Sequence, residues 1–485
     1  MQESNPRNVV VLVMDTARAK TVFGDEGPDF STLSQLSESG EYCRTAFADA
    51  PWTLPSHASL FTGTPPSVHG AHAGHKGLAD NFTTMAEIFS RNGFRTGAFT
   101  NNAWVTDDFG LLRGFDDTYR IWQFMQSDVD LGPAALEISK LDLLKSISSK
   151  FVQGNPLKNI INALYGQFFY RNSDYGAKRT NKLIRQWIAS SEEPFFLFAN
   201  YLEPHLEYRP PKRYASEYLT CDYEEAMDIP QDPWDFLCGE TNINEEYLEH
   251  LNELYRAEIA YLDHRLGELI DWFKDNGYFD DTLFIIVGDH GENIGEHGLM
   301  DHQYCLYDSV LRVPLIVRGG GFGGGQEIEE LIQLSDILPT LMDIFCIDDD
   351  ARSKMKGQSF APHSDTQRRS FTLSEYLAPQ PSLETLKKRY DSIPGRVKGF
   401  DRKLRSIRTL EHRLILGTDG MVELYDASSD TDEQADIAAQ NPDLVEKLKQ
   451  EMSQRLPPLD TMSDSSEGLD IEDGVQRHLE DLGYL

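Results

Sequence analysis

Short apolar runs that end in polar side chains constrain the fold of this chain more than any other feature. They lie at Asn8–Met14, Pro194–Asn200 and Thr282–Val287. Runs of about four to eight residues, rich in Val, Ile or Phe, are typical of strands that are buried on both faces. Helical patterns separate them, as at Phe82–Asn92 and Glu246–Asn276. This alternation predicts an α/β fold with a large, mostly parallel central sheet flanked by helices.

The sequence pattern changes near residue 362, where we predict a second structural unit. Short candidate strands and then a helical pattern follow, at Phe371–Glu375, Leu404–Thr409, Arg413–Gly417, Val422–Tyr425 and Asn441–Arg455. We therefore predict a catalytic α/β domain over residues 1–362, a smaller α+β domain over residues 363–457, and an acidic tether with a terminal helix over residues 458–485. An insert over about residues 128–172 predicts a packed helix pair, with an amphipathic lid or a membrane-surface helix as the alternative.

The chain is strongly acidic, with 79 Asp and Glu against 45 Lys and Arg among 485 residues and a formal net charge of −34. We expect no nucleic-acid partner, because phosphate backbones are bound by basic surfaces. The acidic residues are spread along the chain and Lys is scarce, which is typical of proteins from salt-loving organisms. An ordinary acidic soluble enzyme is the alternative interpretation.

Cysteine usage and the amino-terminus bear on the cellular compartment. The five Cys residues lack the spacing of a metal site and are odd in number, which predicts reduced thiols rather than disulfides. The amino-terminal residues run directly into the first predicted strand without the features of a secretory signal. No apolar run is long enough to span a bilayer. We therefore expect a soluble, cytoplasmic protein without a transmembrane segment.

Polar residues follow each of the three predicted buried strands. Asp15 follows the first strand, Glu203 and His205 follow the second, and Asp289 and His290 follow the third. Open α/β sheets place their functional sites at the carboxyl ends of their strands. The sequence therefore predicts that these side chains share one edge of the sheet, although each alone is also compatible with a helix cap or a structural role.

The stretch Pro51–Gly63, PWTLPSHASLFTG, places a hydroxyl residue between two prolines. Pro51 and Pro55 restrict the backbone on either side of Thr53. A helix that starts at Pro55–Ser56 would have free N–H groups for an anion. A lone hydroxyl at such a turn is also a common helix cap. The stretch indicates a catalytic role for Thr53 only in combination with the residues at the strand ends.

Asp15, Asp289, His290 and the hydroxyl of Thr53 together predict a divalent-cation site. Carboxylates and neutral imidazole suit Zn²⁺ or Mn²⁺. A cation there would lower the pKa of the Thr53 hydroxyl and activate it as a nucleophile. Further side chains are candidates for contact with a tetrahedral anion or for protonation of its leaving group. These are His57, His75, Lys76, His205 and His302.

Several ordered motifs resemble the sulfatase family of the alkaline phosphatase superfamily, and the similarity extends over nearly the whole chain. They include DTAR, TLPSHASLFTG, PPSVHGAH, GDHGENIGEHG, SDILPTLMDI and HLEDLGYL. The resemblance implies a mixed central sheet, a smaller carboxyl-terminal antiparallel sheet with a helix, and one bound divalent cation. It also assigns positions. Asp15, Asp289 and His290 fall on metal-ligand positions and Thr53 on the nucleophile position, while His57, Lys76, His205 and His302 fall on or near anion-contacting positions.

The chain departs from the family pattern at four of these positions and at Thr16. Thr53 stands where active sulfatases have a Cys or Ser that is oxidised to formylglycine, and Thr16 replaces the second Asp of the metal pair. His57 replaces an Arg, His290 an Asn, and His302 a Lys. Thr cannot form the aldehyde, because its methyl group would lead to a ketone. The ligand changes favour Mn²⁺ or Zn²⁺ over Ca²⁺ or Mg²⁺ and resemble the Thr-using phosphodiesterases of the superfamily.

We therefore predict a metal-dependent ester hydrolase, or phosphotransferase, in which Thr53 attacks a phosphate ester or a phosphonate. The alternatives are a true sulfatase that acts on a sulfated sugar or aryl ester and a catalytically silent, sulfatase-like binding protein. The expected substrate is a small-molecule, glycan or lipid ester. One cation is expected, rather than two with a second held by Glu203, His205 and His302. The sequence does not indicate the oligomeric state.

Overall fold

The computed structural model describes residues 6–24, 30–122, 174–241, 243–362, 364, 368–459, 475–476 and 479. The insert predicted over residues 128–172 lies outside the described residues, as does nearly all of the tether and terminal helix predicted over residues 458–485.

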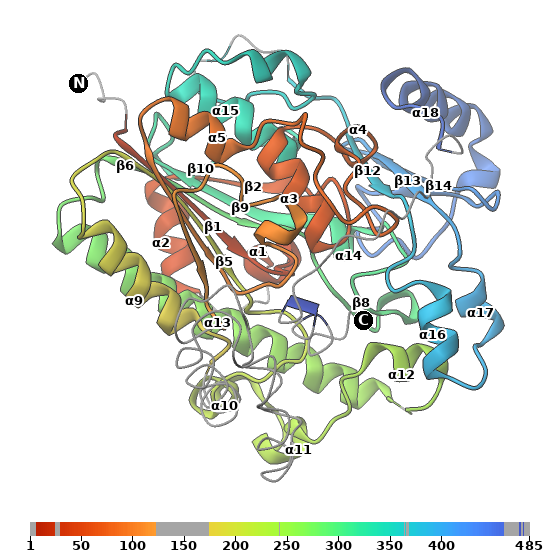
Figure 1. The fold of residues 1–485 in the computed structure, drawn as a ribbon. Helices are drawn as coiled ribbons and strands as arrows, with labels where there is room; N and C mark the ends of the chain where they lie inside the picture. The colour runs from red at the N-terminus through yellow and green to blue at the C-terminus, as the bar shows by residue number, and fades with distance from the viewer. Residues whose placement is uncertain are drawn as a thin grey trace, which may run out of the picture.

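A nine-stranded sheet forms the centre of the described part of the chain (Figure 1). Its strands are β1 (Asn8–Met14), β2 (Glu41–Phe47), β3 (Arg95–Thr100), β4 (Asp117–Arg120), β5 (Phe195–Tyr201), β6 (Thr282–Gly288), β9 (Arg312–Arg318), β10 (Gln326–Glu327) and β11 (Ile332–Gln333). Their order is β10-β2-β9-β6-β1-β5-β3-β4, with β11 paired to β2. Only β9 runs antiparallel to its neighbours among these strands. The predicted α/β fold with a mostly parallel sheet is confirmed.

Helices cover both faces of this sheet (Figure 1). The helices of the main body are α1 (Ala19–Phe23), α2 (Ser31–Ser39), α3 (Thr53–Thr62), α4 (Pro66–His69), α5 (Met85–Arg91), α9 (Ala177–Ile188), α10 (Lys212–Tyr218), α11 (Tyr223–Met227), α12 (Pro233–Cys238), α13 (Glu245–Asp275), α14 (Asp308–Leu311) and α15 (Ile337–Ile344). None of the described helices is both long and apolar enough to cross a bilayer.

The central strand β1 is buried along its whole length, and its side chains alternate between the two faces of the sheet. Val9 and Val11 pack in one apolar cluster with residues of α3, α5 and α15. Val10 and Leu12 pack in the other with residues of α2, α9 and α13. Complete burial of each such side chain stabilises the fold by about 1.5–3 kcal/mol. A strand of this kind has to be apolar on both faces, which is why its sequence is a continuous apolar run.

The register of the central strands determines where the polar residues after them meet. Met14, the last residue of β1, lies opposite Tyr201 of β5 and Gly288 of β6. The three strands therefore end at the same level. Asp15 and Asp289, which come next in their chains, leave the sheet side by side.

A separate four-stranded antiparallel sheet follows near the carboxyl-terminus, as predicted. Its strands are β12 (Thr372–Tyr376), β13 (Leu404–Arg408), β14 (His412–Gly417) and β15 (Val422–Asp426), and the helices of this region are α16 (Leu383–Arg389), α17 (Gly395–Lys398) and α18 (Pro442–Arg455). Leu448 and Met452 of α18 pack against Ile407 and Leu414 of the sheet. The exact domain boundaries at residues 362 and 457 stay a prediction.

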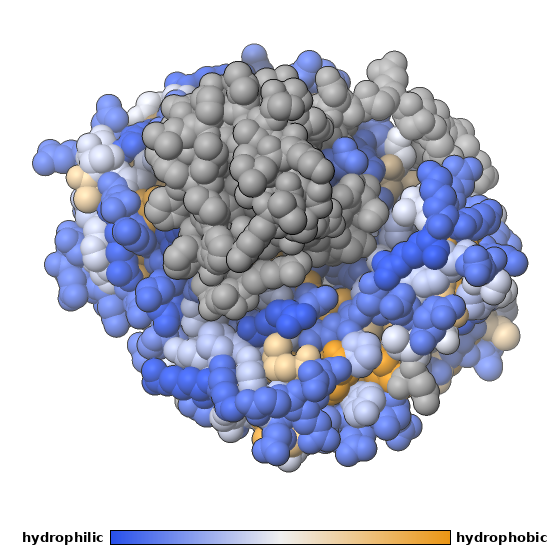
Figure 2. Space-filling model, turned by 60° about the horizontal axis from the view of Figure 1, so that its bottom comes forward, coloured by the Kyte–Doolittle hydropathy of each residue, from blue (hydrophilic) through white to orange (hydrophobic). Residues whose placement is uncertain are grey.

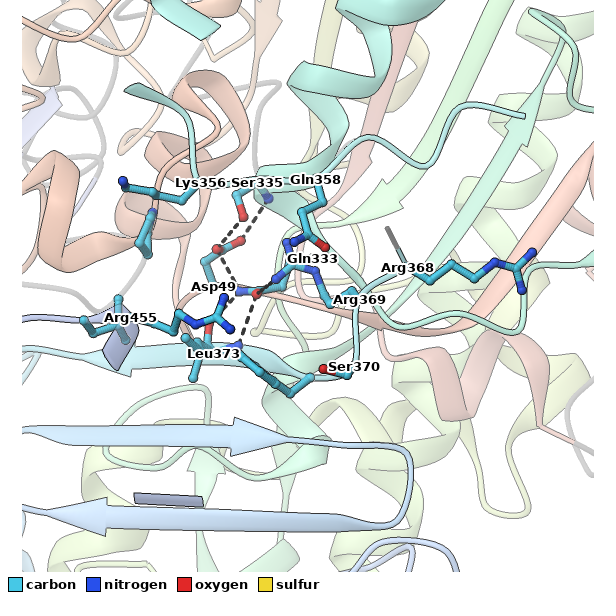
Figure 3. Close-up of a pocket in the computed structure, with 13 residues that line it drawn as sticks. Asp49, Gln333, Ser335, Lys356, Gln358, Arg368, Arg369, Ser370, Leu373 and Arg455 are labelled. Carbon is cyan, nitrogen blue, oxygen red and sulfur yellow. Dashed lines mark hydrogen bonds between the residues drawn. The ribbon is translucent and has the colours of Figure 1, made fainter. Parts of the chain in front are cut away.

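A cavity of about 240 Å³ lies where this small sheet joins the main body (Figure 3). At its floor the buried carboxylate of Asp49 accepts hydrogen bonds from Gln333 Nε2 at 2.9 Å and from the backbone N–H of Ser335 at 3.0 Å. Two arginines of the lining are neutralised, since Arg369 pairs with Asp336 and Arg368 with Glu330. Gln333 of β11 also accepts a hydrogen bond from the backbone N–H of Leu373 in β12 at 3.1 Å, which ties the small sheet to the large one beside the cavity.

The surface of the described residues is mostly hydrophilic, as expected from the high content of charged residues. Figure 2 shows one face on which the described residues are mostly hydrophilic, with a small apolar patch. Among the described residues, Leu410 is the only large hydrophobic side chain that is exposed. The five Cys residues all lie in described segments, and none of them is paired in a disulfide there.

Candidate active site

The structure brings Asp15, Thr53, Asp289 and His290 together at the carboxyl ends of β1 and β6. Asp15 and Asp289 follow these strands directly, and Thr53 is the first residue of α3. His290 Nε2 lies 3.3 Å from Thr53 Oγ1, 3.3 Å from Asp289 Oδ2 and 3.9 Å from Asp15 Oδ1. All four side chains are completely buried.

Each carboxylate of this group has one anchored oxygen and one oxygen that faces the imidazole. Asp15 Oδ2 accepts hydrogen bonds from Asn102 Nδ2 at 2.8 Å and Asn200 Nδ2 at 3.0 Å. Asp289 Oδ1 accepts from the backbone N–H groups of Thr16 and His290. Asp15 Oδ1 and Asp289 Oδ2 have no hydrogen-bond partner within the described residues.

These orphan oxygens and the imidazole fit a divalent cation. Bonds of about 2.0–2.1 Å in a tetrahedral site separate the ligand atoms by roughly 3.3 Å, close to the spacings around His290 Nε2. Burial, followed by the charge of Asp15, raises the pKa of Asp289 well above its usual value. Burial lowers the pKa of His290, so its ring is neutral and able to coordinate a metal. Its Nδ1 lies 3.0 Å from the carbonyl oxygen of Gly291, an arrangement that directs Nε2 at the carboxylates.

The hydroxyl of Thr53 is held at the start of α3 by two contacts. Besides the approach to His290, Thr53 Oγ1 accepts a hydrogen bond from Asn102 Nδ2 at 3.2 Å. The Ser56 hydroxyl donates to the carbonyl oxygen of Asp289 at 2.6 Å and joins α3 to the end of β6. The helix therefore begins at Thr53, two residues earlier than the predicted start at Pro55, and its first turn lies against the carboxylate pair.

His57 and Lys76 lie near this group in different ways. His57 Nδ1 lies 2.9 Å from the carbonyl oxygen of Thr53 and 3.5 Å from Asp289 Oδ2. Burial lowers the pKa of His57 to about 4, so it does not supply the positive charge of an arginine. Lys76 Nζ lies 5.2 Å from the ring centroid of Trp104, which in turn packs edge-on against Trp52. Lys76 is thus linked to the site through the residue that precedes Thr53.

His205 and His302 continue the row of imidazoles that starts at His290. The ring centroid of His302 lies 4.3 Å from that of His290 and 5.3 Å from that of His205. Burial lowers the pKa of His205. Burial alone would also lower the pKa of His302, but Asp301 and Glu292 together raise it well above its usual value. The structure therefore places both residues beside the carboxylate pair.

Glu203 does not lie in a group of metal-type ligands with His205 and His302 among the described residues, so the structure lends no support to the alternative of a second metal held by these three. Its Oε1 accepts a hydrogen bond from the backbone N–H of Ala177 at 3.3 Å. Among the described residues, the second group with metal-type ligands is Glu292, Asp301 and His302. Glu203 is unsuited to hold a metal with His205 and His302, because its carboxylate is bonded to the first residue of α9 and not to the row of imidazoles.

The buried state of Glu203 leads to a pH-dependent prediction. Burial, followed by the charge of Asp174, raises the pKa of Glu203 to about 8. The unfolded chain ionises Glu203 near its ordinary pKa, whereas the folded chain does not, so the folded state loses stability as the pH rises through this interval. Glu203→Gln removes this loss. We expect its free energy of unfolding, relative to wild type, to rise by a few kcal/mol between pH 5 and pH 8.5.

Urea unfolding at the two pH values measures this difference. Glu446→Gln, an exposed substitution on α18, is the matched control and should track wild type at both pH values. If the free energies of unfolding of Glu203→Gln and wild type differ by the same amount at both pH values, Glu203 ionises with its ordinary pKa in the folded chain.

Sequence reasoning missed Asn102, Asn200, Glu292 and Asp301. Asn102 comes two residues after β3, and Asn200 is the penultimate residue of β5. Their strand-end positions were the available signal, but an amide after a strand also commonly caps a turn. The amides became recognisable only from their hydrogen bonds to Asp15.

Asn102 links the nucleophile position to the carboxylates, so its removal should affect both. We expect Asn102→Ala to lower kcat about 10- to 100-fold, because outer partners that orient metal-site groups contribute effects of this size. Steady-state kinetics together with metal titration measure the effect. Asn92→Ala, which removes the Asn92 Nδ2 bond to Ile88 at the end of α5, is the control. Wild-type kcat and metal affinity in Asn102→Ala would exclude the positioning role.

Comparisons with known proteins identify the family. The family model described as Sulfatase matches residues 7–347, and the model described as N-sulphoglucosamine sulphohydrolase, C-terminal, matches residues 295–460. The chain is 23% identical over 471 residues to arylsulfatase K of Bos taurus, which covers 92% of this chain and 81% of the relative. It is 25% identical over 387 residues to choline-sulfatase of Rhizobium meliloti, which covers 76% of this chain and 74% of the relative.

Solved structures show the same fold. The phosphonate monoester hydrolase of Agrobacterium radiobacter superposes with a TM-score of 0.68 at 18% identity, covering 93% of this chain and 96% of that chain. A 2-O GAG sulfatase superposes with a TM-score of 0.66 at 18% identity, covering 93% of each chain. The likeness at this low identity is a likeness of fold.

Proposed function

The chain belongs to the sulfatase family, and we propose that it hydrolyses a phosphate ester or a phosphonate through a nucleophilic Thr53. Members of the family and their structural neighbours are ester hydrolases. One observation carries the proposal. The hydroxyl that stands at the nucleophile position belongs to a threonine, and it lies 3.3 Å from His290 Nε2 within the buried group of Asp15 and Asp289.

Asp15, Asp289 and His290 are the residues that we propose to hold a divalent cation, with Thr53 Oγ1 beside them. Two carboxylates and one imidazole favour Mn²⁺ or Zn²⁺ over Ca²⁺ or Mg²⁺. When bound, such a cation lowers the pKa of an adjacent hydroxyl and stabilises negative charge on the substrate.

We assign a separate role in the reaction to each of the other side chains of the site. Asn102 orients the Thr53 hydroxyl and Asp15 through one amide group. Thr53 Oγ forms the new bond to phosphorus as the alcohol leaves, and water later releases the phosphate from threonine. His205 and His302 line the same site and are proposed to contact the oxyanion or assist the leaving group. Complete burial of the reacting groups strengthens these electrostatic contacts.

The choice of phosphorus over sulfur rests on the chemistry of threonine. Sulfate release through formylglycine requires an aldehyde that reforms its carbonyl, and the methyl group on Cβ of Thr53 prevents that route. A phosphothreonine can be hydrolysed by water. The neighbour named a phosphonate monoester hydrolase supports the same choice. Sulfate-ester hydrolysis remains the second candidate, because the family model and the curated relatives carry sulfatase names.

A substrate panel tests the proposal. The purified chain is assayed with aryl phosphate, phosphodiester, phosphonate and sulfate esters in the presence of Mn²⁺ or Zn²⁺. The assay includes molar salt, because we propose that the net charge of −34 reflects adaptation to a salt-rich cell. We expect phosphate or phosphonate turnover. Thr53-dependent sulfate release without phosphate release would overturn the preference, and the absence of turnover and of bound metal would favour a binding protein.

A further inference from the structure

The hairpin that follows His290 carries three buried polar residues to the edge of the candidate site. It consists of β7 (Asn293–Ile294) and β8 (Met300–Asp301), with Glu292 directly before it and His302 directly after it. Glu292 and His302 are completely buried, and Asp301 is 6% exposed. The ring centroid of His302 lies 4.3 Å from that of His290, so the end of this hairpin contacts the proposed cation site.

The carboxylate of Asp301 makes two contacts with His302. Asp301 Oδ1 lies 2.5 Å from His302 Nδ1 and accepts the backbone N–H of His302 at 2.7 Å. Glu292 Oε1 lies farther from the same ring nitrogen, at 3.3 Å. Ligands of one tetrahedral cation are separated by roughly 3.3 Å, so the 2.5 Å spacing is that of a charge-assisted hydrogen bond from an Nδ1–H group. Asp301 is the closer of the two carboxylates that hold this imidazole.

The backbone of Asp301 is fixed for this contact. Its φ of 74° lies in the left-handed region, which Asp and Asn adopt more readily than other side chains because they bond to the local backbone. The carbonyl oxygen of Asp301 accepts a hydrogen bond from Asn293 Nδ2 at 2.8 Å, and Asn293 Oδ1 accepts one from the hydroxyl of Ser309 at 2.7 Å. Such conformations persist where the surrounding structure determines them, and they cluster at functional sites.

The other two imidazoles of the row are anchored by backbone carbonyl groups. His205 Nδ1 lies 2.5 Å from the carbonyl oxygen of Leu206, and His290 Nδ1 lies 3.0 Å from that of Gly291. The bond at one ring nitrogen sets the tautomer and the direction of the other nitrogen. A hydrogen bond to a carboxylate is about twice as strong as one between neutral groups. Asp301 therefore fixes the orientation of His302 more firmly than a backbone carbonyl could.

We propose that Asp301 is a positioning residue that acts through His302. Its carboxylate holds the Nδ1–H group, so that His302 meets the substrate through Nε2. A lysine, which the family has at this position, needs no such partner because its donors share one terminal group, whereas an imidazole has to be held in one orientation and one tautomer. The inference rests on the proposed function, in which His302 contacts the oxyanion or the leaving group, and it adds the residue that orients this contact.

Proton NMR of the intact chain tests the hydrogen bond without any substrate. An imidazole N–H that is bonded to a carboxylate gives a far-downfield resonance, which isotope-labelled histidine and its loss in His302→Ala assign to His302. We expect this resonance to move upfield or disappear in Asp301→Asn, because the amide keeps the backbone contact but loses the charge. Asp263→Asn, the matched control, alters a buried aspartate that accepts backbone N–H groups of Thr32 and Leu33, and should leave the resonance in place. The absence of this resonance in wild type, or its persistence in Asp301→Asn, would overturn the proposal.

A double-mutant cycle tests whether Asp301 acts through His302 during turnover. Steady-state rates on an aryl phosphate in the presence of Mn²⁺ are compared for wild type, Asp301→Asn, His302→Ala and the double variant. We expect Asp301→Asn to lower kcat about 10- to 100-fold with KM nearly unchanged, because a misplaced group weakens contacts made in the transition state. The double variant should turn over at the rate of His302→Ala alone. Additive losses would show that Asp301 acts independently of His302 and would overturn the proposal.

The two measurements separate this proposal from the proposed function. A wild-type chain that turns over no ester contradicts the proposed function, and the NMR resonance then decides by itself whether Asp301 holds His302. Glu292→Gln distinguishes the two carboxylates, since the resonance should stay far downfield when the more distant partner is changed. A resonance that moves in Glu292→Gln and stays in Asp301→Asn would assign the role to Glu292 and refute it for Asp301. Circular dichroism verifies that each variant is folded.

Discussion

Replacing Thr53 with alanine is expected to lower kcat for the preferred ester by at least about 10³-fold, because the covalent route then has no nucleophile. The hydrogen bonds of the Thr53 hydroxyl go to His290 and Asn102, which belong to the site and not to the hydrogen bonding of the sheet. The variant should therefore remain folded and should still bind metal at Asp15 and Asp289. Steady-state kinetics on matched phosphate and sulfate esters measure the effect.

Two further variants make the Thr53 result specific. Thr62→Ala removes another buried hydroxyl of α3, one that donates to Ala58 at the opposite end of the helix. It should cost only about 1 kcal/mol of stability and leave kcat within a few-fold of wild type. Thr53→Ser keeps the hydroxyl and should keep measurable turnover. If Thr53→Ala hydrolyses the ester at more than a tenth of the wild-type rate, Thr53 is not the nucleophile.

Removing metal is expected to abolish turnover and to lower the melting temperature together. Asp15 Oδ1 and Asp289 Oδ2 are completely buried and lack hydrogen-bond partners among the described residues, so without a cation the pair is relieved only by protonation of Asp289, whose pKa is raised by burial and by Asp15. A ligand that binds only the folded state at about 1,000 times its Kd stabilises that state by about 4 kcal/mol. Dialysis against a chelator should therefore lower Tm by several degrees, and Mn²⁺ or Zn²⁺ should restore both Tm and activity.

Asp289→Asn is the internal control for this experiment. It removes one charge of the pair and should make Tm much less sensitive to the chelator while activity stays low. The hydrogen bonds that Asp289 Oδ1 accepts from backbone N–H groups remain possible for the Asn side chain. Full turnover by wild type after quantitative removal of metal would contradict the proposed role of Asp15, Asp289 and His290.

The central part of the fold was predictable because its signals are local. A strand that is covered on both faces has to be apolar over nearly its whole length, and β1, β5 and β6 are completely buried and carry polar side chains only near their ends. β2 was missed for the complementary reason. Its sequence, EYCRTAF, has four half-buried positions, two of them Glu41 and Arg44, because only short strands and β9 flank it. Such a strand resembles a loop in sequence.

For the candidate site, the sequence predicted which residue types follow the strands, but not which of their side chains meet. The strand-end rule correctly selected Asp15, Asp289 and His290 for one edge of the sheet. The rule places a backbone position and not the direction of a side chain, as Glu203 shows, whose carboxylate accepts a hydrogen bond from Ala177. It also gave no weight to Glu292 and Asp301, whose meeting depends on the register of the β7–β8 hairpin.

The sequence by itself therefore determined the family of this protein and the strands that carry the candidate site. Only the tertiary structure decided which groups meet. Thr53 and His290 are 237 residues apart, and their 3.3 Å approach depends on the order of β6, β1 and β5 and on the hydroxyl of Ser56 that joins α3 to β6. Residue type is a local property of the chain, whereas a distance between remote residues is set by the packing of the whole core.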